Sequence, residues 1–175
     1  MCIRDRANPK DWNEIWIASF SKGVFYSNNG GSTLEERRIG IGSDGETLGR
    51  ISLAIPNDAS IVYAVSYESK GTDGKYSYIY STVNKGKEWQ KIYSGGNFMG
   101  EQGWYNNCIS VKPDNPKILI AGGQTSMVRS IDGGKNWNTT GSGVHADHHC
   151  YEFDPLNTNI SVSYTHLTLP TSDLV

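Results

Sequence analysis

The stretch Ser130-Ile131-Asp132-Gly133-Gly134-Lys135-Asn136-Trp137 decides the fold of this chain. An Asp at a hairpin turn accepts backbone N–H hydrogen bonds, the glycines supply positive φ, and a Trp packs the turn onto the sheet. Residues 118–122 and 127–129, just before it, have the apolar and β-branched composition of two short strands. We therefore expect this segment to be a turn between antiparallel strands.

Two weaker copies of this segment stand at matching positions. Ser81 to Trp89 is read as a copy that is one residue longer, with Gly86 at its centre and Asn84 in place of the Asp. Ser27 to Leu34 is weaker still, with Gly31 retained, Asn29 in place of the Asp and Leu34 in place of the Trp. The second unit is longer because of a predicted hairpin tip at 71–74, where a loop tolerates insertion. Laying the units over one another predicts matching places for Trp16, Tyr63 and Leu119.

A second landmark is a turn rich in Pro, Asn and Asp, at 55–58, 112–116 and 154–157. Each unit then reads as strand, Pro/Asn turn, strand, loop, strand, Gly-rich turn, strand. The turn prolines Pro56, Pro113 and Pro155 are 57 and 42 residues apart, a spacing typical of propeller blades. We predict an all-β partial β-propeller of four-stranded antiparallel blades, about two complete blades plus parts of two more. The blade parts are about 7–39, 50–93, 107–140 and 149–161.

The two ends of the chain differ from this repeat. Residues 1–6 and 162–175 resemble translated sequencing-adapter read-through at the ends of metagenomic reading frames. We expect both to be non-native tails, and a partial propeller over 7–161 whose remaining blades are missing from this chain.

The composition narrows the partners. The formal charge is −2, so no excess of basic residues is available to neutralise phosphates, and nucleic acid is not an expected partner. No run of about 18 apolar residues is present, so no membrane span is expected. We predict no cofactor.

The expected strand order assigns the loops to two faces. The Pro/Asn turns and the Gly-rich turns lie at one end of the blades, and the loops between blades, 40–50, 94–106 and 138–149, lie at the other. Propellers generally bind ligands on that second face.

The last of these loops contains a cluster of polar side chains. If it enters a strand there, His145, Asp147 and His149 share one side at period two. Asp147 is then a candidate catalytic acid or nucleophile of a glycosidase, and the two His are candidate ligand-binding residues. Metal ligation and a merely structural hydrogen-bonded cluster are the other interpretations, and we predict no metal site.

The middle loop holds three further candidate ligand-binding residues, the adjacent aromatics Trp104 and Tyr105 and, just before them, Glu101. Such side chains suit stacking on sugar rings or gripping a peptide, although packing between blades is an equally simple role. Cys108 and Cys150 each precede a turn proline by five residues and so take equivalent places on adjacent inner strands. The sequence leaves their redox state open.

The Gly-rich turn resembles the Asp-box, or bacterial neuraminidase repeat, through Ser130, Asp132, Gly134 and Trp137. This resemblance implies that the boxes are structural turns at the blade periphery, and it assigns that role to Ser81, Gly86, Trp89, Ser27 and Gly31 as well. Segments 102–105, 110–116 and 145–149 resemble secreted bacterial Asp-box propellers, some of them xyloglucanase-like or sortilin-like. Sialidases also carry these boxes, but Arg37, Arg38, Arg50 and Arg129 do not stand in the context of the sialidase arginine triad.

The resemblance implies an extracellular or cell-surface bacterial propeller that recognises or hydrolyses polysaccharide; as an enzyme it would be a glycoside hydrolase. The alternatives are a non-catalytic sortilin-like propeller that binds protein or peptide, and a scaffold module of a surface protein.

Overall fold

The computed structural model describes residues 3–42, 45–70 and 74–165. Every regular element in these ranges is a strand, and together the strands form three four-stranded sheets and one two-stranded sheet. The strands are β1 Ile3–Asn8, β2 Asp11–Ser19, β3 Gly23–Ser27, β4 Glu35–Glu36, β5 Thr47–Ala54, β6 Val62–Ser69, β7 Lys75–Thr82, β8 Gln90–Tyr93, β9 Cys108–Val111, β10 Leu119–Gly122, β11 Met127–Ser130, β12 Asn138–Thr140, β13 His148–Phe153 and β14 Ser161–Thr165.

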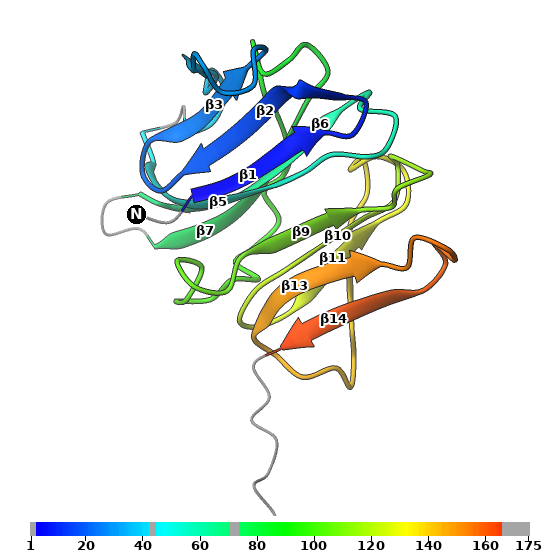
Figure 1. The fold of residues 1–175 in the computed structure, drawn as a ribbon. Coiled ribbons are helices and arrows are strands. Elements are labelled where there is room, and N and C mark those ends of the chain that lie inside the picture. The colour runs from blue at the N-terminus through cyan, green and yellow to red at the C-terminus, as the bar shows by residue number, and fades with distance from the viewer. Residues whose placement is uncertain (1–2, 43–44, 71–73, 166–175) are drawn as a thin grey trace, which may run out of the picture.

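The sheets are consecutive antiparallel meanders, which we call blade 1 (β1–β4), blade 2 (β5–β8), blade 3 (β9–β12) and blade 4 (β13–β14). Their first strands, β1, β5, β9 and β13, contact one another in that order, so the blades stand side by side about an axis (Figure 1). This arrangement confirms the prediction of an all-β partial propeller. Within the described ranges no helix is long and apolar enough to cross a membrane.

Side chains from facing sheets fill the spaces between blades. Trp16 and Ala18 of blade 1 pack against Leu53 and Ala64 of blade 2 in one buried cluster. The other side of blade 2 packs against blade 3 in a second cluster, which includes Tyr63, Val65, Leu119 and Ala121. Blade 2 is therefore covered on both faces, which explains the nearly continuous burial of its second strand.

One expected match between the units is wrong by a single residue. Trp16 and Tyr63 do match, because both face the following blade. Leu119 instead faces the preceding blade, and Ile120, which contacts Tyr151 of blade 4, takes the equivalent place. A shift of one residue along a strand turns the side chain to the other face.

The Gly-rich turn of blade 2 also begins one residue later than predicted. The Thr82 hydroxyl donates to Asn84 Oδ1 (2.9 Å) and accepts from the Gly86 N–H (3.1 Å). The same two bonds are made by Ser27 in blade 1 and by Ser130 in blade 3. The turn-initiating hydroxyl is therefore that of Thr82 and not of Ser81, and the three turns have one common spacing with no extra residue.

Each of the last two Gly-rich turns is attached to the preceding blade. The Trp89 indole N–H donates to the Arg37 carbonyl oxygen (2.8 Å), and that of Trp137 to the Ile92 carbonyl oxygen (3.0 Å). A Cβ on Gly134, whose φ is +89°, would lie 2.5 Å from Ile92 Cδ1, so a larger residue there would be strained and would displace the Ile92 side chain. Leu34, at the same place in blade 1, is 49% exposed.

Two segments that the sequence analysis set outside the propeller take part in strands. Residues 3–6 belong to β1, which pairs with β2, and residues 162–165 belong to β14, which pairs with β13. Backbone pairing depends little on side-chain identity, so the difference from the repeat did not prevent it. The predicted foreign origin of the two tails remains a prediction. Residues 1–2, 166–175 and the hairpin tip at 71–73 lie outside the described residues.

The predicted division into two ends is present in the structure. At one end the Asn57 N–H donates to the Pro113 carbonyl, and the Gly133 N–H to the Lys117 carbonyl. Pro/Asn turns and Gly-rich turns are therefore neighbours there. The loops between blades and the β10–β11 hairpin lie at the other end, which we call the rim.

Candidate ligand-binding rim

The segment 94–107, between β8 and β9, is a long loop that is nevertheless firmly anchored. Phe98 and Met99 are buried in the core between blades 2 and 3. The Met99 N–H donates to Ser77 Oγ (3.1 Å), and the Thr125 N–H donates to the Phe98 carbonyl (3.0 Å). The loop is thus held by both blades.

Tyr67, near the end of β6, supports the tip of this loop. Its hydroxyl donates to the Glu101 carbonyl oxygen (3.2 Å). Its ring lies so close to Gly103 that a Cβ there would be 2.2 Å from Tyr67 Cδ2. The Glu101 side chain is 74% exposed and forms an ion pair with Lys75.

Trp104 and Tyr105 follow directly and are 56% and 41% exposed. Their ring centroids are 5.6 Å apart, and the Tyr105 ring contacts the His149 ring edge-on at 4.7 Å. Two large aromatics therefore face solvent on an anchored loop, instead of closing the space between blades. We call this pair the aromatic platform.

Arg50 lies beneath the platform. Its side chain is buried, and Nη1 donates to the Tyr105 carbonyl (2.5 Å) and the Trp104 carbonyl (3.3 Å). The Asn107 amide in turn donates to the Arg50 carbonyl (2.9 Å), and Ser52 Oγ donates to the Asn107 carbonyl (3.0 Å). The sequence analysis considered Arg50 only as a sialidase arginine and missed this role.

Asp147 does not lie in a strand, contrary to the expected period-two arrangement. Its φ is +66°, and its N–H donates to the Gln124 carbonyl (3.2 Å). Its Oδ1 accepts a hydrogen bond from the Asn106 amide (2.7 Å). β13 begins one residue later, at His148. Positive φ at this entry breaks the alternation on which the prediction depended.

The three His side chains consequently have separate surroundings. His145 is exposed, and its Nδ1 lies 2.7 Å from the Ala146 carbonyl oxygen. His149 contacts the aromatic platform. His148 is buried, and desolvation lowers its pKa. Of the predicted ligand-binding residues, the structure therefore brings His149 to Tyr105 and leaves His145 apart. The described residues hold no group of three His, Cys, Asp or Glu arranged for a metal ion.

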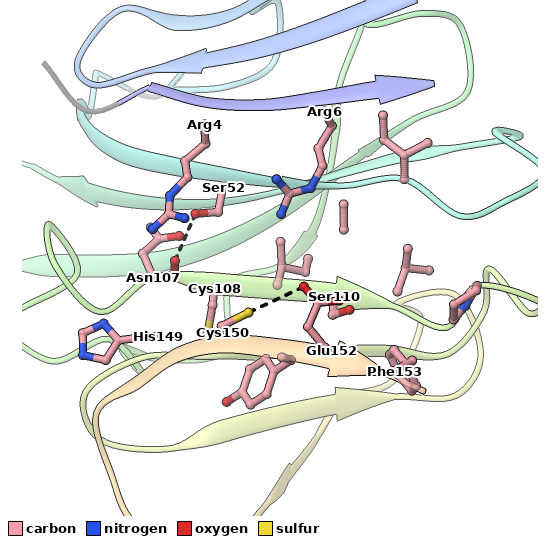
Figure 2. A pocket seen from close by; sticks show the side chains of 16 residues that line it. Arg4, Arg6, Ser52, Asn107, Cys108, Ser110, His149, Cys150, Glu152 and Phe153 are labelled. Carbon is pink, nitrogen blue, oxygen red and sulfur yellow. Dashed lines mark hydrogen bonds between the residues drawn. The ribbon is translucent and has the colours of Figure 1, made fainter. Parts of the chain in front are cut away.

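A cavity of about 190 Å³ opens between the inner strands (Figure 2). Its wall includes Ser52, Asn107 and His149, so the cavity shares residues with the surroundings of the platform. Cys108 and Cys150 also border it, and both are free thiols. Burial raises the pKa of the Cys108 thiol to about 12, which disfavours the reactive thiolate.

Comparison with known proteins supports the fold. No family model and no curated protein matches the sequence. The structure is similar to a GH74 xyloglucanase from Xanthomonas campestris, with a TM-score of 0.63 and 17% identity over 92% of this chain and 26% of that one. It is also similar to YCF48 from Cyanidioschyzon merolae, with a TM-score of 0.61 and 13% identity over 97% of this chain and 53% of that one.

A further similar structure is YCF48 bound to D1 peptide, with a TM-score of 0.56 and 15% identity over 78% of this chain and 39% of that one. The GH74 enzymes and YCF48 are β-propellers, so the class of protein is a partial β-propeller. The chain spans about a quarter of the GH74 xyloglucanase and about half of YCF48.

Proposed function

We propose that this chain is part of an Asp-box propeller whose rim binds a polysaccharide by stacking sugar rings on Trp104 and Tyr105. The observation that carries the proposal is the exposure of both rings on a loop anchored by buried Phe98 and Met99. An aromatic pair fixed in advance loses little conformational entropy on binding, and it offers large flat apolar faces. The likeness to GH74 enzymes is compatible with a glycan ligand.

The Asp-box assignment has its own support. In the turn of blade 3, Asp132 Oδ1 accepts hydrogen bonds from the Ser130 hydroxyl (2.9 Å) and the Asn136 N–H (3.0 Å). The Asn136 N–H and the Asn136 side-chain amide, which donates to Oδ2 (2.7 Å), are the main causes that lower the pKa of Asp132 to about 2, and the Ser130 hydroxyl adds to them. The carboxylate is thus used in closing the turn, which is the structural role that the resemblance implies. Its place at the end opposite the rim separates the boxes from the proposed ligand site.

The binding site can be tested with soluble xyloglucan in affinity gel electrophoresis. Trp104→Ala and Tyr105→Ala should each weaken the affinity about tenfold, or about 1.4 kcal/mol, since truncation of an aromatic residue that anchors a ligand typically costs more than about 1 kcal/mol. Trp12, which is 79% exposed at the start of β2 near the Pro/Asn turns, provides the matched control. Equal retardation of Trp104→Ala and the unmodified chain would refute this site, as would an equal loss in Trp12→Ala.

Glycoside hydrolysis is the finer part of the proposal, with Asp147 as the acid. This part of the proposal is supported by the hydrogen bond to the Asp147 carboxylate from the amide of Asn106, which directly follows Tyr105 in the sequence. Hydrolysis needs a second carboxylate, which the remaining blades would supply. In the complete propeller we expect Asp147→Asn to abolish release of reducing sugar while binding persists. Hydrolysis that continues in this variant would remove Asp147 from catalysis.

A peptide ligand is the second candidate, favoured by the likeness to YCF48 in a structure that contains the D1 peptide. This alternative would be selected if no polysaccharide retards the protein in the gel, and if the protein binds a peptide saturably and loses that binding in Trp104→Ala. Export to the cell surface or beyond is also part of the proposal, because free polysaccharide is met there.

The remaining blades of the propeller are the proposed partner of blade 1. Ile15, Ile17 and Phe25 are only partly buried. Their equivalents in blade 2, Val62, Ala64 and Tyr80, are buried in the core shared with blade 1. We infer that another blade of the same propeller covers the corresponding face of blade 1.

A further inference from the structure

We propose that Arg50 is the positioning residue of the aromatic platform: it fixes the orientation of Trp104 and Tyr105 and so sets the affinity of the rim for its ligand. This inference rests on the proposed function of the rim. The observation behind it is that the buried guanidinium of Arg50 forms no ion pair with any of the described residues.

Arg50 is 8% exposed. Its recorded partners are two main-chain carbonyl oxygens, those of Trp104 and Tyr105, both reached by Nη1. Its buried Nε has no hydrogen-bond partner among the described residues. Burying a charged guanidinium is unfavourable unless its contacts compensate. These contacts hold the backbone of the two residues whose rings are exposed.

A β-bulge directs Arg50 to this place. The register of β5 against β6 shifts between Leu48, which pairs with Glu68, and Ile51, which pairs with Ser66. Gly49 and Arg50 therefore both oppose Tyr67, the residue whose ring and hydroxyl support the loop tip. Bulges re-aim side chains and are common beside functional sites.

A second irregularity stands on the other side of the platform. The register of β13 against β14 shifts between His148 and Cys150, and His149 at that point contacts the Tyr105 ring. The platform is thus held from blade 2 through its backbone and from blade 4 through its ring. Arg50 contacts both platform residues, because its Nη1 donates to the carbonyl oxygen of Trp104 and to that of Tyr105.

A structural role alone would change stability and leave the geometry of the platform intact once the chain is folded. The proposal predicts more: in folded protein, loss of the guanidinium changes how the two rings face one another. Lysine keeps the charge but presents a single ammonium in place of the planar fork. Arg50→Lys should therefore retain part of the function, and Arg50→Met should retain less.

The first measurement needs no ligand. The circular dichroism of the Trp104–Tyr105 pair is isolated by subtraction. For the unmodified chain and for each Arg50 or Arg37 variant, the spectrum of the same protein with Trp104→Phe added is subtracted. In Arg50→Met this difference signal should fall to less than about half, with Arg50→Lys in between. Arg37→Met is the control, because the Arg37 side chain is also largely covered but contacts Glu35 and Tyr26 of blade 1 instead of the platform.

The second measurement is binding of soluble xyloglucan at a temperature where every variant is folded. We expect Arg50→Met to weaken binding about tenfold, a difference of about 1.4 kcal/mol, and Arg37→Met to leave it unchanged. An unchanged difference spectrum in folded Arg50→Met would overturn the inference. An unmodified chain that does not bind xyloglucan counts against the proposed function alone, since the spectroscopic result still decides the role of Arg50. If Arg50→Met does not fold, Arg50→Lys decides, and an unaltered spectrum in that variant sinks the proposal.

Discussion

The indole nitrogen of Trp137 lies 3.0 Å from the carbonyl oxygen of Ile92, and this hydrogen bond joins the Gly-rich turn of blade 3 to the outermost strand of blade 2. Trp89 makes the equivalent bond one blade earlier, to Arg37. The turns therefore connect blades as well as strands. Their contribution to stability can be separated by substitutions at matched positions.

Replacing Trp137 by Phe should lower the free energy of unfolding by about 1–2 kcal/mol. A smaller aromatic ring remains, but the Ile92 and Gly134 carbonyls lose their indole donor. Trp89→Phe should have a similar effect. Urea titration followed by circular dichroism measures both, and Leu34→Phe, at the exposed equivalent place in blade 1, should change stability by less than about 0.5 kcal/mol.

The glycines of the turns should differ in their tolerance of alanine. Gly31, Gly86 and Gly134 all have positive φ, so alanine is strained at each. A Cβ at Gly86 would also lie 2.8 Å from Trp16 Cζ3, and one at Gly134 2.5 Å from Ile92 Cδ1. At Gly31 the nearest atom is 3.8 Å away. Gly86→Ala and Gly134→Ala should therefore destabilise by about 1–3 kcal/mol more than Gly31→Ala, the cost of overpacking. Equal losses in all three would show that contact between blades is unimportant.

The corrected start of the blade 2 turn gives a direct test. Thr82→Val removes the hydroxyl bonded to Asn84 and to the Gly86 N–H, and should reduce stability by about 1 kcal/mol or more. Ser81→Ala, one residue earlier, should change it by less than about 0.5 kcal/mol. Thermal unfolding of the two variants measures both losses. A larger loss of stability in Ser81→Ala would mean that the turn begins at Ser81, as the sequence predicted.

Stability should depend on pH through Glu68, which is fully buried in blade 2. Desolvation raises its pKa, although the Tyr80 hydroxyl donates to it (2.9 Å). A raised folded-state pKa means that the group favours folding when protonated, and that this stability is lost as pH rises through the folded pKa. Glu68→Gln keeps an acceptor for Tyr80 and should be more stable than the unmodified chain at pH 7.

The same comparison at low pH provides the control. Near pH 4 the advantage of Glu68→Gln should shrink, because the folded carboxyl is increasingly protonated there. Urea titrations of both proteins at pH 4 and pH 7 give the two differences. A constant difference between them would mean that charge on Glu68 has no influence on folding.

The sequence was sufficient for the architecture because turn chemistry is local. Asp132, Gly134 and Trp137 lie within one short turn, so their spacing predicts a hairpin without knowledge of the rest of the chain. The alignment of strands was harder. Residues 118–122 are apolar throughout, and a strand buried on both faces shows no alternation that distinguishes Leu119 from Ile120.

The rim could be predicted only in part. Trp104 and Tyr105 were identified by residue type, and the anchoring of their loop explains why they are exposed. The place of Arg50 depends on a bulge, which arises from the pairing of β5 with β6 and leaves no pattern in the sequence. The left-handed backbone of Asp147 likewise occurs where its N–H bonds to the β10–β11 hairpin, a contact between distant segments that the local sequence does not show.

The bonds from Trp89 and Trp137 end on main-chain oxygens, which every amino acid supplies. In blades 2 and 3 the turn thus supplies its own donor to a backbone group that any neighbouring blade presents. A duplicated repeat that keeps this Trp would find an acceptor for its indole in any neighbouring blade, while the side chains that fill the space between the blades would still have to match.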